Sequence, residues 1–145
     1  PQVEGVVTIT MGDNAIGGGW VLSCREEVFE PSPADRGGRL SKNNVDLLRK
    51  TDRWSAVLDY DCLTSLSIRS SEKNDRFTPL GMPQKRVSMM DYLMERKIPR
   101  RARNKWPMVC AGDQVVWVPG CQISHYFRVS PTTKKVMALS LFQRS

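Results

Sequence analysis

Residues 107–118 have the sequence PMVCAGDQVVWV, and the fold prediction starts from them. Apolar residues dominate both of its ends, and Ala111-Gly112-Asp113 between them has the composition of a tight turn. Two apolar, partly β-branched runs that flank such a turn are typical of a β-hairpin. The stretch therefore predicts an antiparallel pair of strands, after which Pro119-Gly120 turns the chain.

A helix is predicted shortly before this hairpin. Ser88 stands where an N-cap belongs, with Asp91 three residues later, and Pro99 ends the segment because proline disfavours a helical residue before it. A second, short helix is expected over residues 100–106, beginning at Pro99. The apolar residues that share one face of the first helix, and are expected to pack in the core, are Val87, Met90, Leu93 and Met94.

Strands are predicted on both sides of this unit. We expect residues 3–11 and 20–24 to pair as a hairpin, and we interpret Gly17-Gly18-Gly19 as part of its loose loop, because no P-loop lysine follows these glycines. The other strand candidates, chosen for their apolar or alternating character, are residues 54–60, 66–69, 126–129 and 134–142.

The order of these elements predicts an α+β fold. Residues 1–64 form a β-rich segment with a long loop at 30–44, where Pro, Gly, Ser and Asn interrupt any periodic pattern. Residues 65–145 form a small α+β module with one or two helices packed on antiparallel strands. The chain has 145 residues, of which 40% are hydrophobic and 26% charged, and it is long enough to bury a core of this kind.

Charge is distributed unevenly along the chain. Residues 1–72 hold 8 Lys or Arg and 11 Asp or Glu, a net charge of −3, whereas residues 73–145 hold 14 and 4, a net charge of +10. Many of the cations lie between residues 85 and 105, with Phe77, Tyr92 and Trp106 nearby. A solvated basic surface and a nucleic-acid interface both fit this pattern. If it is an interface, the pattern favours contacts to the backbone of an RNA helix over readout of bases.

No arrangement of residues indicates an active site. The single histidine, His125, lies four residues after Cys121 in a segment interpreted as extended, a spacing that does not by itself bring a nucleophile and a base together. The pair Asp59 and Asp61 has no further metal ligands around it. We therefore expect no catalytic residue, no metal site and no cofactor in this chain.

The cysteines and the start of the chain bear on where the protein is located. Cys24, Cys62, Cys110 and Cys121 are far apart and form no CxxC pair, which favours buried thiols in a reducing compartment. No apolar run approaches the roughly 18 residues of a membrane span. The start at Pro1 has no signal-peptide character, and the missing initiator Met suggests a processed protein or a piece of a larger one.

An ordered series of motifs over residues 66–142 resembles the C-terminal domain of tRNA(Ile)-lysidine synthetase. Asn74 stands where that family usually has Gly, a position at which Asn tolerates a positive φ better than most residues. The matching motifs, in order, are Leu66-Ser67-Ile68-Arg69, Asn74 to Met82 (NDRFTPLGM), Arg96-Lys97-Ile98-Pro99, Arg103, Trp106-Pro107, Val115 to Gly120 (VVWVPG), Phe127-Arg128-Val129, Thr132-Thr133 and the final strand.

The resemblance implies the tRNA-handling part of an ATP-dependent tRNA-modifying ligase. In that family an N-terminal PP-loop domain, marked by Ser-Gly-Gly-x-Asp-Ser, uses ATP to activate the wobble cytidine of tRNA(Ile) and attaches lysine. That motif is absent from this sequence. ATP and lysine are thus expected for a separate catalytic domain, and this chain is expected to hold the acceptor stem and backbone of tRNA(Ile). The implied compartment is the bacterial cytoplasm or an organellar stroma or matrix.

The resemblance and the charge pattern together select candidate tRNA contacts. For Arg76 a structural role is weighed equally with a phosphate contact: Asp75 and Arg76 form a pair that pins their loop. For the whole chain the alternative is a lysidine-synthetase-like module retained as a structural or interaction subunit of a larger assembly, whose partner is then a protein. The residues expected to contact phosphates are Arg69, Arg76, Lys85, Arg86, Lys97, Arg100, Arg101 and Arg103.

Overall fold

The computed structural model describes residues 1–3, 5–28, 53–63, 65–72 and 74–144. The long loop expected at residues 30–44 lies outside the described residues. Within the described part the elements are antiparallel strands and short helices, so the predicted α+β class is confirmed. In that same part, no helix is long and apolar enough to cross a membrane.

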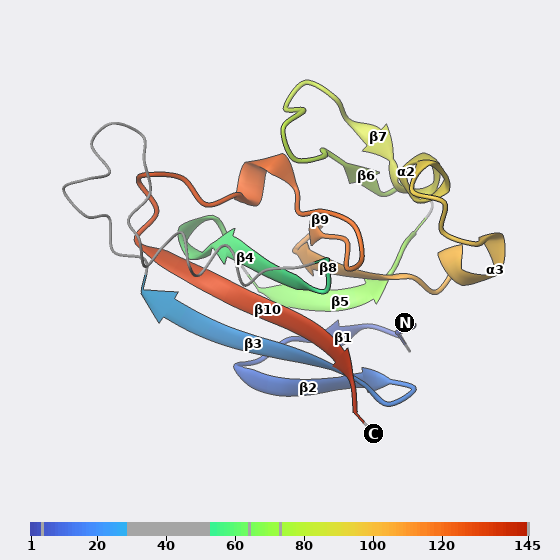
Figure 1. The fold of residues 1–145 in the computed structure, drawn as a ribbon, viewed down its shortest axis with the longest axis horizontal. Coiled ribbons are helices and arrows are strands. Elements are labelled where there is room, and N and C mark those ends of the chain that lie inside the picture. The colour runs from blue at the N-terminus through green and yellow to red at the C-terminus, as the bar shows by residue number, and fades with distance from the viewer. Residues whose placement is uncertain (4, 29–52, 64, 73, 145) are drawn as a thin grey trace.

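Two four-stranded antiparallel sheets form most of the molecule (Figure 1). The first has the order β1-β5-β8-β9, and its strands are β1 Val7–Thr8, β5 Leu66–Ser70, β8 Pro107–Ala111 and β9 Gln114–Trp117. The second has the order β2-β3-β10-β4, and its strands are β2 Gly12–Gly17, β3 Trp20–Val28, β4 Ser55–Asp59 and β10 Lys135–Gln143.

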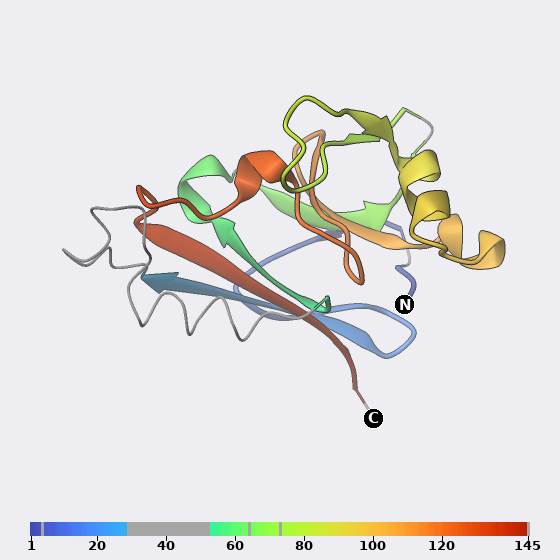
Figure 2. The ribbon, with the colours of Figure 1, turned by 45° about the horizontal axis from the view of Figure 1, so that its top comes forward.

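A smaller unit lies beside the first sheet. It contains the strand pair β6 Arg76–Phe77 and β7 Val87–Ser88, followed by helices α2 Met89–Glu95 and α3 Arg100–Arg103. Two 3-10 turns, η2 Tyr60–Cys62 and η3 His125–Phe127, complete the described elements. Figure 2 shows β5 and β8 between this unit and the second sheet.

Strand β8 is buried along its whole length because it packs on both of its faces. Val109 and Ala111 join a core cluster that includes residues of the second sheet, such as Leu139. Met108 and Cys110 alternate with them and join a separate cluster with side chains of α2 and β6. Burial raises the pKa of the Cys110 thiol to about 11, so this side chain stays neutral inside the core.

Both sheets combine strands from before and after residue 64. Val7 of β1 pairs with Ile68 of β5, and β10 pairs along its length with β3 and with β4. The boundary expected between residues 64 and 65 therefore does not assign each sheet to one part of the chain. Each sheet needs both parts of the chain to satisfy its backbone hydrogen bonds.

The prediction that residues 3–11 and 20–24 pair as a hairpin is wrong. The strand that pairs with β3 is β2, whose polar sequence GDNAIG resembles a loop, while β1 pairs with β5. The buried side chain of Asn14 explains how β2 forms: its Oδ1 accepts from Thr10 N at 2.9 Å, and its Nδ2 donates to Thr10 O at 2.9 Å and Leu22 O at 3.1 Å. A single amide thus satisfies backbone groups of the segment before β2 and of the neighbouring strand β3.

Helix α2 begins where the capping signal predicts, but it buries a different face. Ser88 Oγ accepts from Asp91 N at 3.2 Å, as expected of an N-cap. The buried residues are Met89, Tyr92 and Leu93, whereas Met90 is 42% and Met94 51% exposed. The expectation that these two methionines pack in the core is therefore wrong, because Tyr92 packs edge-on against Phe77 and turns the helix toward it.

Two further expectations are corrected. Residues 126–129 form no strand, since His125–Phe127 is a 3-10 turn. Buried thiols are confirmed for Cys24 and Cys110, while Cys62 is exposed. The expected strands at residues 54–60, 66–69 and 134–142 are confirmed as β4, β5 and β10.

Gly120 lies against two tryptophan rings that join the smaller unit to the second sheet. The ring centroids of Trp54 and Trp106 are 6.2 Å apart, and Trp106 Nε1 donates to Pro119 O at 2.9 Å. The φ of Gly120 is +82°, and a Cβ on it would lie 3.0 Å from Trp54 Cη2 and 3.1 Å from Trp106 Cζ2. Any side chain here would meet both the left-handed backbone and the rings.

We predict that Gly120→Ala lowers the free energy of unfolding by about 2–4 kcal/mol, the sum of the left-handed backbone cost and the overpacking cost. Gly112→Ala is the matched control, because Gly112 has a φ of +59° and open space around its Cβ position. The control is expected to lose only the backbone part, about 1 kcal/mol. Urea unfolding of both variants measures the difference, and equal losses would contradict the role of the rings.

Candidate nucleic-acid interface

The predicted phosphate contacts fall into three groups in the structure. Arg69 lies on β5 beneath the loop before β6, and its side chain is 12% exposed. Arg76, Lys85 and Arg86 lie on β6 and the loop between β6 and β7. The last group, on α3 and at the end of α2, is Lys97, Arg100, Arg101 and Arg103.

Arg69 is a structural residue. Its Nη1 and Nη2 donate to Asp75 Oδ2 and Oδ1 at 2.8 and 2.9 Å, and the Asp75 side chain is only 8% exposed. Asp75 also accepts from Glu72 N at 2.6 Å. The prediction that Arg69 contacts phosphate is therefore corrected, because its guanidinium is covered and its charge is compensated.

The ion pair that pins this loop contains Arg69 instead of the expected Arg76. Asp75 pairs with Arg69, while the Nη1 of the exposed Arg76 only donates to Asp75 O at 3.2 Å. Burial alone would raise the pKa of Asp75, but the hydrogen bonds from Arg69 and from Glu72 N hold that pKa below its ordinary value. The hydrogen bonds to Asp75 in turn raise the pKa of Arg69, so both groups stay charged.

We predict that Asp75→Asn lowers the free energy of unfolding at pH 7 by about 3 kcal/mol, because it leaves Arg69 covered and uncompensated. The folded-state pKa of Asp75 is lowered, so its contribution is fully present above the unfolded pKa of about 3.9 and is lost as the pH falls through the folded value. The difference from the parent chain should therefore shrink below about pH 4.

Urea unfolding of both chains at neutral and acidic pH tests this expectation. The matched control is Asp113→Asn, which changes an exposed aspartate that forms no ion pair with any described residue. It should stay within about 0.5 kcal/mol of the parent. A loss for Asp75→Asn that is equally large under acidic and neutral conditions would contradict the ion pair.

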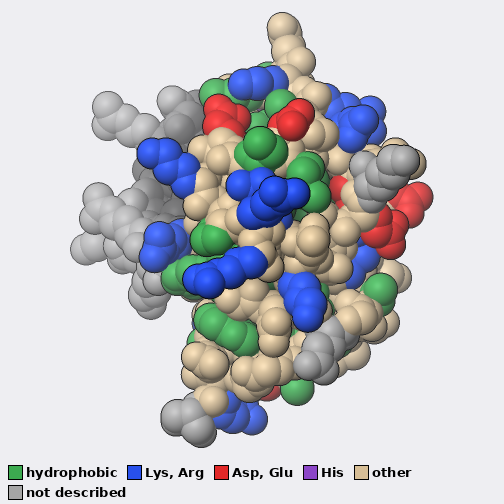
Figure 3. All heavy atoms as spheres, turned by 90° about the vertical axis from the view of Figure 1, so that its right-hand side faces the viewer, with side chains coloured by type: hydrophobic (Ala, Val, Ile, Leu, Met, Phe, Trp, Pro, Cys, Tyr) green, Lys and Arg blue, Asp and Glu red, His purple; other side chains and the backbone are tan. Residues whose placement is uncertain are grey.

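The third group forms a basic face together with two neighbouring cations that the prediction did not include, Arg96 and Lys105. The basic face is defined here as Arg96, Lys97, Arg100, Arg101, Arg103 and Lys105. Figure 3 views the side of the molecule that carries α2 and α3, and Lys and Arg side chains lie across its centre. Arg103 anchors α3 to the segment that follows α2, since its Nε donates to Ile98 O at 2.8 Å. The short helix α3 therefore holds its arginines in a set position relative to the end of α2.

The charges of the basic face are not compensated within the described residues. None of its six members forms an ion pair with a described acidic side chain. Arg96 lies over the Tyr92 ring, with its guanidinium carbon 5.3 Å from the ring centroid. The other members except Arg103 are exposed to solvent. Such a face attracts polyanions.

Lys97 occupies a backbone position that ordinarily belongs to glycine. Helix α2 ends in a Schellman motif, in which Ile98 N donates to Leu93 O at 3.0 Å and Lys97 N to Met94 O at 2.9 Å. Lys97 has a φ of 61°, and among the described non-glycine residues it alone has a positive φ. The motif thus presents a cation at a strained position.

We predict that Lys97→Gly raises the free energy of unfolding by about 1 kcal/mol, because glycine adopts this φ without strain. Lys105→Gly removes the same charge at a position without a positive φ and serves as the control. Thermal or urea unfolding measures both. A destabilised Lys97→Gly variant would show that the lysine side chain itself holds the end of the helix.

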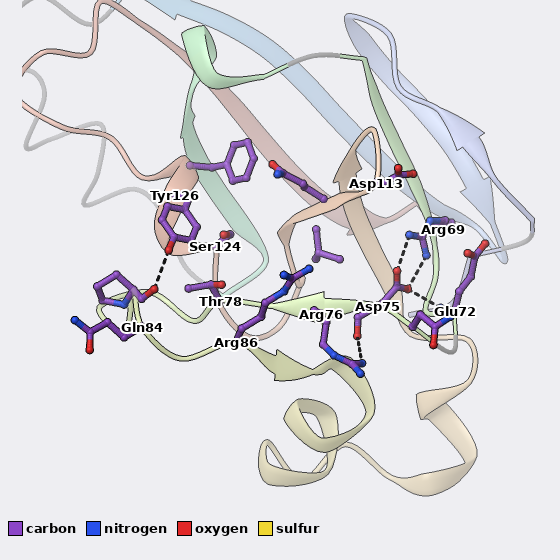
Figure 4. A pocket seen from close by; sticks show the side chains of 15 residues that line it. Arg69, Glu72, Asp75, Arg76, Thr78, Gln84, Arg86, Asp113, Ser124 and Tyr126 are labelled. Carbon is purple, nitrogen blue, oxygen red and sulfur yellow. Dashed lines mark hydrogen bonds and ion pairs between the residues drawn. The ribbon is translucent and has the colours of Figure 1, made fainter.

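The second group borders a groove of about 760 Å³ (Figure 4). Arg76 and Arg86 line it, together with residues of the loop before β6, the β8–β9 turn and η3. Lys85 is exposed next to Arg86 and is not among the lining residues. The predicted contacts on this loop thus lie on a hollow surface, and those on α2 and α3 on a separate one.

Several residues that line the groove were not among the predicted phosphate contacts. Thr78, Ser124 and Tyr126 line the groove, and they come together because Ser124 pairs with Pro79 and His125 N donates to Thr78 O at 3.0 Å. More than forty residues separate the two segments in sequence. No local pattern signals this contact, although Phe127-Arg128-Val129 is one of the motifs that carry the resemblance.

Comparison with known proteins identifies the family to which the chain belongs. Residues 66–140 match the family described as the TilS substrate C-terminal domain. The tRNA(Ile)-lysidine synthase of Caldanaerobacter subterraneus subsp. tengcongensis is 37% identical over 107 residues, which are 70% of this chain and 23% of that protein. That of Clostridium acetobutylicum is 30% identical over 106 residues, 72% of this chain and 23% of that protein. This chain thus spans under a quarter of these relatives.

Solved structures show the same fold. A crystal structure of a TilS C-terminal domain superposes with a TM-score of 0.72, covering 97% of each chain at 17% identity. An N-terminal fragment of the phenylalanyl-tRNA synthetase beta-subunit from Pyrococcus horikoshii reaches 0.57, covering 84% of this chain and 38% of that one at 17% identity. The motif series, the family match and the shared fold agree, and this chain belongs to the C-terminal domain family of tRNA(Ile)-lysidine synthetase.

Proposed function

We propose that this chain is the part of a tRNA(Ile)-lysidine synthetase that binds tRNA through its phosphate backbone. In this proposal a separate PP-loop domain carries out the ATP-dependent attachment of lysine to the wobble cytidine, and this chain holds the acceptor stem and backbone of the same tRNA. The observation that carries the proposal is the basic face, whose cations have no described acidic partner.

The chemistry of the basic face suits phosphates better than bases. Arginine forks match the geometry of phosphate oxygens, and the face presents Arg100 and Arg101 in adjacent positions of one helix. Helix α3 has only four residues, which is too short to read a groove. Contacts of this kind recognise the shape and charge of an RNA helix, which positions a substrate without reading its sequence.

The relatives support the division of labour in this proposal. Both relatives are tRNA(Ile)-lysidine synthases, and this chain matches 23% of the length of each. The remaining length accommodates a catalytic domain that uses ATP and lysine. Since these relatives are bacterial, we propose the cytoplasm of a bacterium, or a compartment of bacterial origin, as the location.

Binding of a tRNA(Ile) transcript at several salt concentrations tests the proposal. We predict that affinity falls steeply between about 50 and 200 mM salt, because phosphate contacts release counterions. The double variant Arg100→Gln, Arg101→Gln should lower the affinity at least about tenfold and reduce the salt slope by about two. Filter binding or fluorescence anisotropy measures both quantities.

The matched control is the double variant Arg25→Gln, Lys134→Gln, which removes the same charge. Arg25 lies within the second half of β3 and Lys134 directly precedes β10, and this part of the second sheet is far from α3 (Figure 1). It should change the slope by much less. Absence of tRNA binding at low salt, or equal effects of the two double variants, would refute the basic face. A stoichiometric protein partner purified without tRNA would favour the alternative of an interaction subunit.

A further inference from the structure

We propose that the groove between the β6–β7 loop and η3 binds one unpaired nucleotide of an RNA, with its phosphate on Arg76 and Arg86 and its base against Tyr126. This inference rests on the proposed RNA binding and adds a second contact, which is specific for single strands. The basic face on α2 and α3 would hold the helical part of the same RNA.

The groove has the size and the fixed walls of a small-ligand site. Its volume of about 760 Å³ lies within the range typical of such sites. Three hydrogen bonds fix the loop to η3: His125 N donates to Thr78 O at 3.0 Å, Gly81 N to His125 Nδ1 at 3.1 Å, and Tyr126 Oη to Pro83 O at 2.8 Å. A ligand therefore meets walls that are already in place, which reduces the cost of binding.

The charges of the groove are arranged on two sides. In Figure 4 Arg86 extends into its middle, with Tyr126, Ser124 and Thr78 on one side and Asp75, Arg69 and Asp113 on the other. Arg86 has no ion pair or side-chain hydrogen bond to any described residue, and Arg76 has only the bond to Asp75 O. The guanidinium of Arg86 and the remaining N–H groups of Arg76 can therefore bind an anion.

The acidic groups of the groove limit which anion fits. Asp75 is compensated by Arg69, but Glu72 and Asp113 are exposed and line the groove without an ion pair to a described cation. A stretch of phosphates along the whole groove would meet these carboxylates. A single phosphate joined to a base and a sugar, which carry hydrogen-bond donors, fits both sides.

Hydroxyl groups in the wall of the groove lack partners in the described structure. Ser124 is 3% exposed and lines the groove, yet its Oγ forms no hydrogen bond with a described residue. Thr78 Oγ1 is likewise without a described partner, and Thr78 is half-buried. Buried hydroxyls are ordinarily satisfied, so these two mark positions where a ligand can supply the partner.

Tyr126 offers a ring for stacking. The residue is 59% exposed, and its hydroxyl is held by Pro83 O, so the ring is fixed while much of it stays accessible. The His125 ring packs edge-on against it, with centroids 5.7 Å apart and an interplanar angle of 82°. An exposed, immobilised aromatic ring beside free arginines is the combination that binds single-stranded nucleic acid.

Two RNA probes separate this groove from the basic face: a single-stranded tetranucleotide and a blunt-ended duplex of two fully paired strands. We expect Tyr126→Leu and Arg86→Gln each to lower the affinity for the tetranucleotide by about tenfold or more, and to change the affinity for the duplex less than about twofold. The variant Arg100→Gln, Arg101→Gln should mainly weaken binding of the duplex. Tyr126→Phe keeps the ring and should retain most of the tetranucleotide affinity.

The outcomes distinguish the two proposals. Duplex binding without tetranucleotide binding overturns the groove and leaves the proposed function intact, whereas failure of both probes refutes both. Tetranucleotide binding that Arg86→Gln and Tyr126→Leu leave unchanged also overturns the groove. If Tyr126→Leu lowers the melting temperature strongly, Arg86→Gln decides alone, because Arg86 makes no described side-chain hydrogen bond or ion pair that folding would miss.

Discussion

Strand β8 has no side that faces solvent, and this constraint organises the rest of the chain. One set of its side chains packs toward the second sheet and the alternate set toward α2, so both layers must be present for the strand to be covered. The second sheet in turn depends on β10 from the far end of the chain. Helix α2 is held in place by the same strand, which determines where the basic face and the groove lie.

The cations of the chain serve two purposes that the structure separates. Arg69 and Asp75 neutralise each other under the loop before β6, and Asp75 O accepts from Met89 N at 3.1 Å, which connects that loop to the first residue of α2. The cations of α2 and α3 lack such partners among the described residues. Net charge alone is therefore a poor guide to binding residues, and the burial of each cation is the better one.

The two proposed contacts differ in what they recognise. The basic face has cations at the ends of short helices, and it suits the regular phosphates of a duplex. The groove combines two arginines with a fixed ring and unpartnered hydroxyls, and it suits a nucleotide that has left the stack. A tRNA has both kinds of surface in one molecule, and under the two proposals this domain contacts both.

Local signals in the sequence predicted the elements whose hydrogen bonds close within a few residues. Ser88 caps α2, the β8–β9 hairpin turns at Gly112, and Pro99 separates the two helices. The motif series also identified the family. Four other features depend on contacts between separate segments. The strand β2, and not residues 3–11, pairs with β3, and α2 buries Tyr92 instead of Met90. Arg69 binds Asp75, and Ser124 and Tyr126 reach the β6–β7 loop. The reason is physical: these choices depend on which distant surface each segment meets, and a segment's own residues do not contain that surface.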